Sequence, residues 1–202
     1  MKPVISYLMS FPAVYSNITR LLRGEKNIRV FVDTFVCPQV HDRVLDIGCG
    51  TGDILNFLPD VEYFGFDLDP FYIKSAQKQF GNRGTFFCKG VSLDAFSAEG
   101  NFDIILAMGI LHHLSDVEAK ELFELAYHLL GPGGRLITYD GCYSENQSVI
   151  KKFILDIDRG KHVRSVAGYK NLATGSFKSV SASVREDLLN IPYTLIIMEC
   201  KK

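Results

Sequence analysis

The stretch "VLDIGCGTGD" (44–53) places three glycines directly behind a short apolar run. Gly48, Gly50 and Gly52 can adopt backbone conformations that other residues resist, and they let a ligand approach the main chain closely. In an open parallel sheet, ligands bind at the carboxyl ends of the strands, often at the loop after the first strand. The stretch therefore predicts a strand followed by a ligand-binding loop.

The spacing of the glycines separates two kinds of nucleotide cofactor. Dinucleotide enzymes use G-x-G-x-x-G, whose third glycine lets the following helix pack closely. Here the third position is Asp53, a carboxylate where a bound pyrophosphate would place negative charge. Asp67, in "FGFDLDP" (64–70), follows Gly48 by 19 positions (67 − 48), near the offset of about 20 expected for a carboxylate that binds ribose hydroxyls. The pattern favours a nucleoside ligand without a pyrophosphate.

Short apolar runs alternate with longer helical patterns from residue 43 onward, which is typical of a parallel sheet flanked by helices. The predicted parallel strands are 43–47, 62–66, 85–89, 102–108 and 134–140. Two further strand-like runs, 177–186 and 191–200, must be antiparallel neighbours because the link between them is too short for a crossover helix.

These patterns predict an α/β fold: a Rossmann-like, seven-stranded, mostly parallel sheet with helices on both faces and an antiparallel C-terminal hairpin. A single domain would cover residues 1–202. Within it we expect an N-terminal helical lid (1–40), a cofactor-binding core (41–140), and substrate-side helices with the terminal hairpin (141–202).

Capping patterns predict where two helices begin. Ser115 with Glu118 forms a capping box, and "GPGG" (131–134) is expected to end that helix with a left-handed cap and a proline stop. Ser144 with Gln147 is expected to open a second helix whose apolar side faces the core. That side is formed by Val149, Ile150, Phe153, Ile154 and Ile157.

Four segments, taken in order and spacing, resemble the class I S-adenosylmethionine-dependent methyltransferases. They are "VLDIGCGTGD", "FGFDLDP", "NFDIILAMGILHHL" (101–114) and "LLGPGGRLITYD" (129–140). The resemblance covers about residues 43–140, and the terminal hairpin is similar to the family's reversed last strand. It implies methyltransferase activity with S-adenosylmethionine as cofactor and S-adenosylhomocysteine as product.

The resemblance also implies a set of cofactor contacts. Asp46 would reach the methionine ammonium, Asp67 would bind both ribose hydroxyls, and Leu68 would pack on the adenine. The backbone carbonyl of Ala107 would accept from the ammonium, and Tyr15 would contact the cofactor from the N-terminal helices. The full set is Tyr15, Asp46, Gly48, Cys49, Gly50, Asp67, Leu68, Val91, Ser92 and Ala107.

The chain departs from the family pattern after the third strand. Relatives often have Gly-Asp-Ala there, with the aspartate accepting from the adenine amine, whereas this chain has "KGVSL" (89–93). The side chain of Val91 cannot accept that bond, but Ser92 can, and the Val91 amide can still donate to the ring. We expect binding to survive with altered adenine recognition.

Two histidines in "LHHL" (111–114) are candidates for the chemistry. Imidazole changes protonation near neutral pH, so His113 is a candidate catalytic base, and His112 and Tyr143 are candidate acceptor contacts. The alternative is that one histidine only braces the loop. A basic run at 159–164 is predicted to be a solvated surface, with contact to an anionic substrate as the alternative.

The composition narrows the partners. Lys and Arg number 22 and Asp and Glu 23, so a basic surface for nucleic acid is not expected, and the acceptor is predicted to be a small molecule. The fourth-strand loop lacks the Asn/Asp-Pro-Pro-Tyr sequence that resembling enzymes use on amide or adenine nitrogens, which favours methylation at oxygen, carbon or a basic amine. The segments 167–177 and 191–200 resemble methyltransferases of sugar- or lipid-linked metabolism, which makes such a metabolite one candidate acceptor. The five cysteines are scattered without a CxxC pair, so no metal site is predicted and a cytoplasmic protein is expected.

No run of about 18 apolar residues predicts a membrane span. The sequence specifies no oligomeric state. Two other functions stay open, a nicotinamide-dependent oxidoreductase and a cofactor-binding protein without catalysis.

Overall fold

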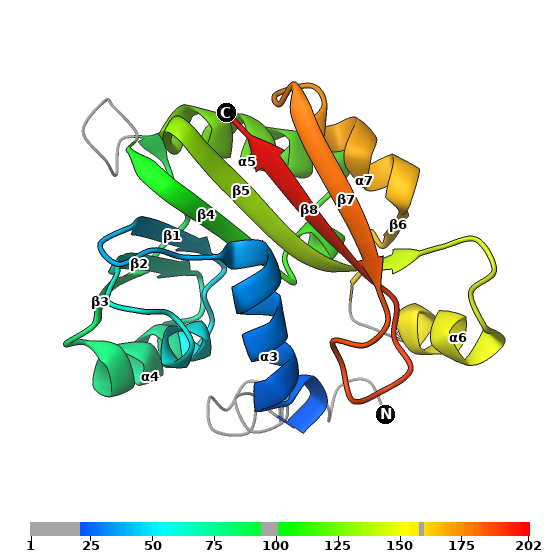
Figure 1. Ribbon diagram of the computed structural model, residues 1–202, viewed down its shortest axis with the longest axis horizontal. Helices are drawn as coiled ribbons and strands as arrows, with labels where there is room; N and C mark the ends of the chain where they lie inside the picture. The colour runs from blue at the N-terminus through cyan, green and yellow to red at the C-terminus, as the bar shows by residue number, and fades with distance from the viewer. Residues whose placement is uncertain (1–20, 94–100, 158–159) are drawn as a thin grey trace.

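A computed structural model describes residues 21–93, 101–157 and 160–202. One twisted sheet runs through it in the order β3-β2-β1-β4-β5-β8-β7 (Figure 1). The first five strands are parallel to their neighbours, and β8 is antiparallel to both β5 and β7. The strands are β1 Arg43–Ile47, β2 Glu62–Asp67, β3 Gly84–Cys88, β4 Phe102–Met108, β5 Leu130–Tyr143, β7 Ser179–Arg185 and β8 Leu195–Lys201. The predicted seven-stranded sheet is confirmed, and a two-residue strand, β6 (Arg164–Ser165), joins the end of β5 as an eighth.

Helices cover both faces of the sheet, as predicted (Figure 1). They are α3 Glu25–Phe31, α4 Pro70–Phe80, α5 Asp116–Leu129, α6 Val149–Ile157 and α7 Val166–Ala173. Helix α3 continues into a π-helical turn, Val32–Val36, and agrees with the second helix expected before residue 40. The first of those two helices falls largely outside the described residues.

Strand β4 shows why the sequence forms a buried parallel sheet. Ile104 and Leu106 lie in the core beneath α3 and α4, whereas Ile105 and Ala107 lie in the core beneath α5 and α7. Successive side chains of a strand point to opposite faces, so a strand covered on both sides must be apolar throughout. The continuous run "FDIILAM" satisfies that requirement.

The ends of α5 differ partly from the prediction. The capping box at its start is present, because Ser115 Oγ accepts from the Glu118 amide while the Glu118 carboxylate accepts from the Ser115 amide. The predicted left-handed cap at its end is wrong. Leu130 is already extended, and β5 begins there, so that the left-handed residue, Gly133 (φ 78°), lies inside the strand segment.

The predicted capping box of α6 is also wrong. Ser148, and not Ser144, accepts from an amide of the first turn, that of Lys151 at 3.4 Å. The Gln147 side chain instead donates to the carbonyl of Cys142 at 3.3 Å, which ties the start of the helix to the end of β5.

The apolar side of α6 does not face the core as predicted, except at Ile154, which is half-buried and packs against the core. Val149, Ile150, Phe153 and Ile157 are between 57% and 85% exposed, and Leu155 is the buried residue of the helix. Helix α6 lies at one end of the molecule, beyond the end of β5 (Figure 1). Periodicity reveals that a helix has an apolar side, but it does not reveal what that side contacts.

Candidate functional site

The loop after β1 has the backbone that its glycines predict. Gly48, Gly50 and Gly52 all have positive φ, at 75°, 55° and 72°. A Cβ at Gly48 would lie 3.1 Å from Ile110, so this position also lacks space for a side chain. The amides of Gly48 and Cys49 both donate to the carbonyl of Phe66, at 2.8 and 3.0 Å, which fixes the loop against the end of β2. Glycine is needed here for conformation and for space.

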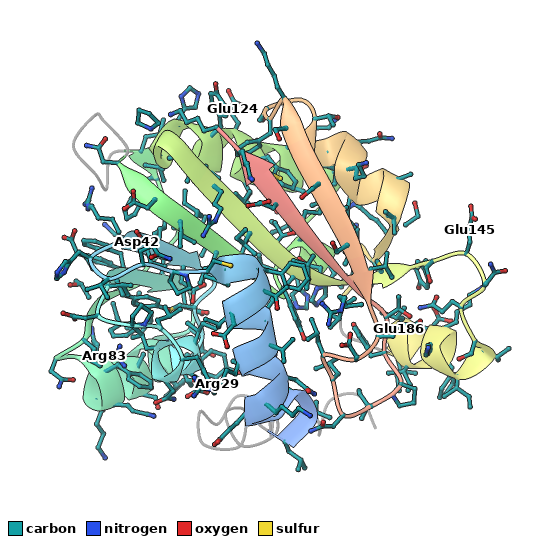
Figure 2. All side chains as sticks on the ribbon, viewed as in Figure 1. Arg29, Asp42, Arg83, Glu124, Glu145 and Glu186 are labelled. Carbon is teal, nitrogen blue, oxygen red and sulfur yellow. The ribbon has the colours of Figure 1, made fainter. Side chains whose placement is uncertain are left out.

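A cavity of about 400 Å³ opens in front of this loop. Its walls include Arg23, Asp46, Gly48, Cys49, Thr51 and Met108. Arg29, labelled in Figure 2, reaches it from α3. Burial raises the pKa of the Cys49 thiol far above its usual range, so Cys49 presents an uncharged side chain. We refer to this space as the glycine-loop cavity.

Asp46 gives the glycine-loop cavity its polar character. The residue is 3% exposed, and its Oδ2 accepts a hydrogen bond of 2.7 Å from the Tyr63 hydroxyl. Among the described residues, Oδ1 has no hydrogen-bond partner. Burial raises the pKa of Asp46 to about 7, against a smaller lowering effect of the Tyr63 hydrogen bond. A buried carboxylate with an unused oxygen fits a cationic group.

Asp67 lies at the end of β2, beside the same loop. Its Oδ2 accepts from the Gly50 amide at 2.9 Å, and its Oδ1 accepts from the Asp69 amide at 2.8 Å. A carboxylate has about four lone-pair sites, so two remain for ribose hydroxyls. Asp67 therefore orders the glycine loop and also fits the ribose role that the resemblance implies.

The other predicted cofactor residues surround this loop less closely. Leu68, next to Asp67, is 77% exposed, so the adenine ring has access to its side chain. Val91 is half-buried and Ser92 is exposed after β3. Ala107 lies in β4 between Ile47 and Thr138 of the neighbouring strands, and the next residue, Met108, lines the cavity. Tyr15 lies outside the described residues.

A second cavity, of about 350 Å³, adjoins the first. Arg23 and Met108 line both cavities and form the border between them. Part of its lining is apolar and consists of Leu22, Ile154, Ile157, Leu189, Ile191 and Leu195. The lining also includes His112, His113, Tyr139 and Asp140. We refer to this space as the acceptor cavity.

His112 and Asp140 form a buried pair in the acceptor cavity. His112 Nδ1 lies 2.8 Å from Asp140 Oδ1, and the same oxygen accepts from the His112 amide at 3.2 Å. His112 is 7% exposed and Asp140 is 1% exposed. Among the described residues, Asp140 Oδ2 has no hydrogen-bond partner. Since the carboxylate accepts at Nδ1, Nδ1 carries the proton and Nε2 keeps its lone pair when the ring is neutral.

His113 and Tyr143 are placed differently from each other. His113 lines the acceptor cavity, with its ring centroid 4.1 Å from that of His112. Tyr143 does not line this cavity, as far as the described residues define it. Its hydroxyl instead donates to Asp156 of α6 at 2.7 Å, and this hydrogen bond raises the pKa of Tyr143.

The predicted solvated basic run is contradicted at Arg164, whose side chain is 11% exposed. Its guanidinium lies under the loop that carries His112 and His113, and bonds to that loop's carbonyl groups. Arg159 lies outside the described residues. Sequence reasoning also missed Arg23, whose guanidinium stacks 5.2 Å from the centre of the Tyr139 ring, because no motif marks it.

Comparisons with known proteins agree with this geometry. A model of the methyltransferase domain matches residues 45–136. The probable tRNA methyltransferase 9B of Mus musculus is 36% identical over 100 residues, which are 48% of this chain and 21% of that protein. The phosphoethanolamine N-methyltransferase of Plasmodium falciparum is 27% identical over 156 residues, which are 74% of this chain and 59% of that protein. The chain thus spans between about a fifth and three fifths of the length of these relatives.

Solved structures share the fold at low sequence identity. The cyclopropane synthase MmaA2 of Mycobacterium tuberculosis superposes with a TM-score of 0.63 at 16% identity, covering 87% of this chain and 76% of that one. A TehB-like SAM-dependent methyltransferase of Corynebacterium glutamicum gives 0.60 at 18% identity, covering 87% and 88%. In the described ranges, no helix is long and apolar enough to cross a membrane. A methyltransferase-domain model thus matches residues 45–136, and the glycine loop, the sheet order and the shared fold support the class I S-adenosylmethionine-dependent methyltransferase that the resemblance implies.

Proposed function

We propose that this protein transfers a methyl group from S-adenosylmethionine to a small molecule bound in the acceptor cavity. The observation that carries the proposal is the shared border at Arg23 and Met108, since a donor in one cavity and an acceptor in the other would meet there. The cofactor supplies an electrophilic methyl group on a sulfonium. The protein has to align the two reactants and exclude water.

The residues of the glycine-loop cavity fit an amino-acid zwitterion next to a nucleoside. Asp46 offers an unused carboxylate oxygen to an ammonium group, and Arg23 offers a guanidinium to a carboxylate. Backbone groups of Gly48, Cys49 and Gly50 would hold the methionine part, as the family resemblance implies. The nucleoside would be bound by Asp67 at the ribose and by Leu68, Val91 and Ser92 around the adenine.

We assign the base role to His112, where a proton has to leave the acceptor. Asp140 holds Nδ1, so the proton would be accepted at Nε2, and the buried carboxylate would stabilise the imidazolium that forms. His113, first considered for this role, lines the same cavity and stays a candidate for contact with the acceptor.

The apolar part of the acceptor cavity's lining favours an acceptor with an apolar body and one polar reactive group. Methylation at oxygen, carbon or a basic amine is consistent with it, and so is a sugar- or lipid-related metabolite. The relative named as a phosphoethanolamine N-methyltransferase supports a small molecule, whereas the relative named as a tRNA methyltransferase supports RNA. A formal net charge of −1 favours the small molecule.

The oxidoreductase alternative has less support. Asp53 begins the short 3-10 helix after the glycine loop, where a dinucleotide site needs its third glycine. A cofactor-binding protein without catalysis could keep the buried His112–Asp140 pair to brace the loop, because Asp140 Oδ1 also accepts from the His112 amide. The position of the pair on the acceptor cavity favours catalysis.

Two measurements test the proposal. Calorimetry with S-adenosylmethionine, S-adenosylhomocysteine and NAD should show binding of the first two compounds; binding of NAD alone would overturn it. Incubation with trideuteromethyl S-adenosylmethionine and either a metabolite extract or total tRNA, followed by mass spectrometry, should show label in a metabolite. The His112→Gln variant serves as the control for enzymatic transfer. Label in tRNA alone would replace the small-molecule acceptor with RNA.

A further inference from the structure

The segment from Gly160 to Ser165 runs back from α6 and lies against the histidine loop, Leu111–Leu114. It ends in β6, where Arg164 and Ser165 pair with Cys142 and Tyr143 at the end of β5. Strand β5 also carries Asp140. One short segment therefore contacts both parts of the chain that supply the His112–Asp140 pair.

Arg164 binds the histidine loop through several hydrogen bonds at once. Its Nη1 donates to the carbonyl of Leu111 at 2.9 Å, and its Nη2 donates to that of Leu114 at 2.7 Å. The same Nη1 donates to the carbonyl of His162 at 2.9 Å, and Nε donates to Asp116 at 2.8 Å. The two loop carbonyls flank the histidines on either side. Because guanidinium donors have a fixed planar geometry, these bonds set the path of the backbone between them.

Gly160 packs on the imidazole ring itself. A Cβ added at Gly160 would collide with Cδ2 and Cγ of His112, although the backbone of Gly160 is not in the left-handed region. The amide of His162 donates to the carbonyl of His112 at 2.9 Å. On the Cε1 edge of the ring lies Gly109, whose added Cβ would be 3.8 Å away. The ring is thus packed tightly against Gly160 on one edge, with Nδ1 on Asp140.

From this geometry we infer that Gly160 and Arg164 are positioning residues for the His112–Asp140 pair. They hold the histidine ring so that Nδ1 donates to Asp140, which leaves the lone pair of Nε2 for the acceptor cavity that His112 lines. The inference rests on the proposed function only in giving this orientation a catalytic purpose. The orientation itself can be measured without a known acceptor.

The test is nuclear magnetic resonance of the full chain with ¹⁵N-labelled histidine, which distinguishes the Nδ1–H and Nε2–H tautomers of each neutral ring. The His112→Gln variant assigns the signal. We expect His112 in the unaltered protein to be a single Nδ1–H tautomer. Arg164→Ala and Gly160→Ala should each convert it to a mixture of both tautomers, by independent perturbations, and Arg164→Lys should restore part of the Nδ1–H form.

Matched controls are available elsewhere in the chain. Arg185→Ala removes an arginine that pairs with Asp187 at the surface, and Gly175→Ala adds a Cβ that meets the Leu172 carbonyl at an ordinary 3.9 Å. Both controls should keep the single tautomer. Circular dichroism identifies any variant that fails to fold. If Arg164→Ala or Gly160→Ala does not fold, the other of the two still tests the inference.

The inference fails if folded Arg164→Ala and Gly160→Ala proteins keep the Nδ1–H tautomer, or if the controls lose it equally. Calorimetry with S-adenosylmethionine separates this failure from that of the proposed function. Gly160 and Arg164 lie away from the glycine loop, so their variants should bind S-adenosylmethionine as the unaltered protein does. Absence of binding to the unaltered protein would contradict the proposed function and leave the tautomer result standing.

Discussion

Replacing Asp46 with asparagine removes a buried ionisable group and keeps its shape. The carbonyl of the new amide can still accept from the Tyr63 hydroxyl, which now bonds to Asp46 Oδ2 at 2.7 Å. The variant cannot become negative, and it carries an amide NH₂ at the position of Oδ1. Its pH dependence, compared with that of the unaltered protein, therefore measures what the charge of Asp46 costs the folded protein.

The cost of that charge follows from the pKa. An ordinary aspartate titrates near 3.8, whereas burial raises the pKa of Asp46 in the folded protein to about 7. Between these values the folded state keeps a proton that the unfolded state has released, so stability falls as the pH rises from about 4 to about 7. At about 1.4 kcal/mol per pKa unit, the whole difference is about 4 kcal/mol, of which about 3 kcal/mol falls between pH 5 and 8.

Urea unfolding of both proteins at pH 5 and pH 8 measures this effect. The free energy of unfolding of Asp46→Asn, relative to the unaltered protein, should rise by about 3 kcal/mol from pH 5 to pH 8. Comparing the two proteins at each pH cancels the titration of all other groups. A relative stability that is independent of pH would refute the raised pKa of Asp46.

Cofactor binding should favour the ionised form of Asp46 over its protonated form. If the methionine ammonium binds Oδ1, the carboxylate must ionise, so binding at pH 6 should release about one proton per cofactor. Calorimetry in buffers of different ionisation enthalpy counts these protons. Asp46→Asn should release none and should bind S-adenosylmethionine about 10- to 100-fold more weakly, since a hydrogen bond to a charged group is worth about 1.5–3 kcal/mol.

Three further substitutions test neighbouring roles. Tyr63→Phe removes the hydrogen bond that lowers the Asp46 pKa, so the pH at which S-adenosylmethionine affinity reaches half its maximum should shift upward in calorimetry. Asp67→Ala should weaken S-adenosylmethionine binding about 10- to 100-fold, and should raise amide hydrogen exchange at Gly50, whose partner it removes. Unchanged affinity would place the ribose contact elsewhere. His112→Gln should lower labelled methyl transfer about 10²- to 10⁴-fold and leave S-adenosylmethionine affinity unaltered; a parallel loss of affinity would contradict its role as a base.

The glycine loop could be predicted from sequence because its requirements are local. Gly48, Gly50 and Gly52 need positive φ, and the strand before them must be apolar on both faces, so a short stretch of residues contains the whole signal. Asp67 could be found for the same reason, since the short connection from β1 to β2, with its 3-10 helix Asp53–Asn56, keeps it near Gly48 in the sequence. What spacing could not show is that Asp67 also bonds to the amide of Gly50.

The orientation of α6 could not be predicted, although its periodicity is clear. An apolar stripe on a helix shows only that one side differs from the other, and the partner is set by where the chain enters and leaves. Here Gln147 ties the start of the helix to the end of β5, which leaves Val149, Ile150 and Phe153 exposed. The Ser144 capping box failed because Ser148 lies nearer to the first helical turn.

The choice between the two histidines shows where sequence reasoning stops. His112 and His113 are adjacent, of the same type, and both line the acceptor cavity, so no local property distinguishes them. The distinction comes from Asp140, 28 positions further along the chain, whose carboxylate lies 2.8 Å from Nδ1 of His112. The position of the histidine loop relative to Asp140 depends in turn on Arg164, which donates to the carbonyls of Leu111 and Leu114 on either side of the histidines. A basic residue in a polar segment is usually solvated. Arg164 is buried instead, because backbone carbonyls accept the hydrogen bonds that water would otherwise accept. The acceptor cavity is thus lined by residues from Leu22 to Leu195, and its histidine loop is held by a contact 50 positions away, which is why its residue types were visible in the sequence and its geometry was not.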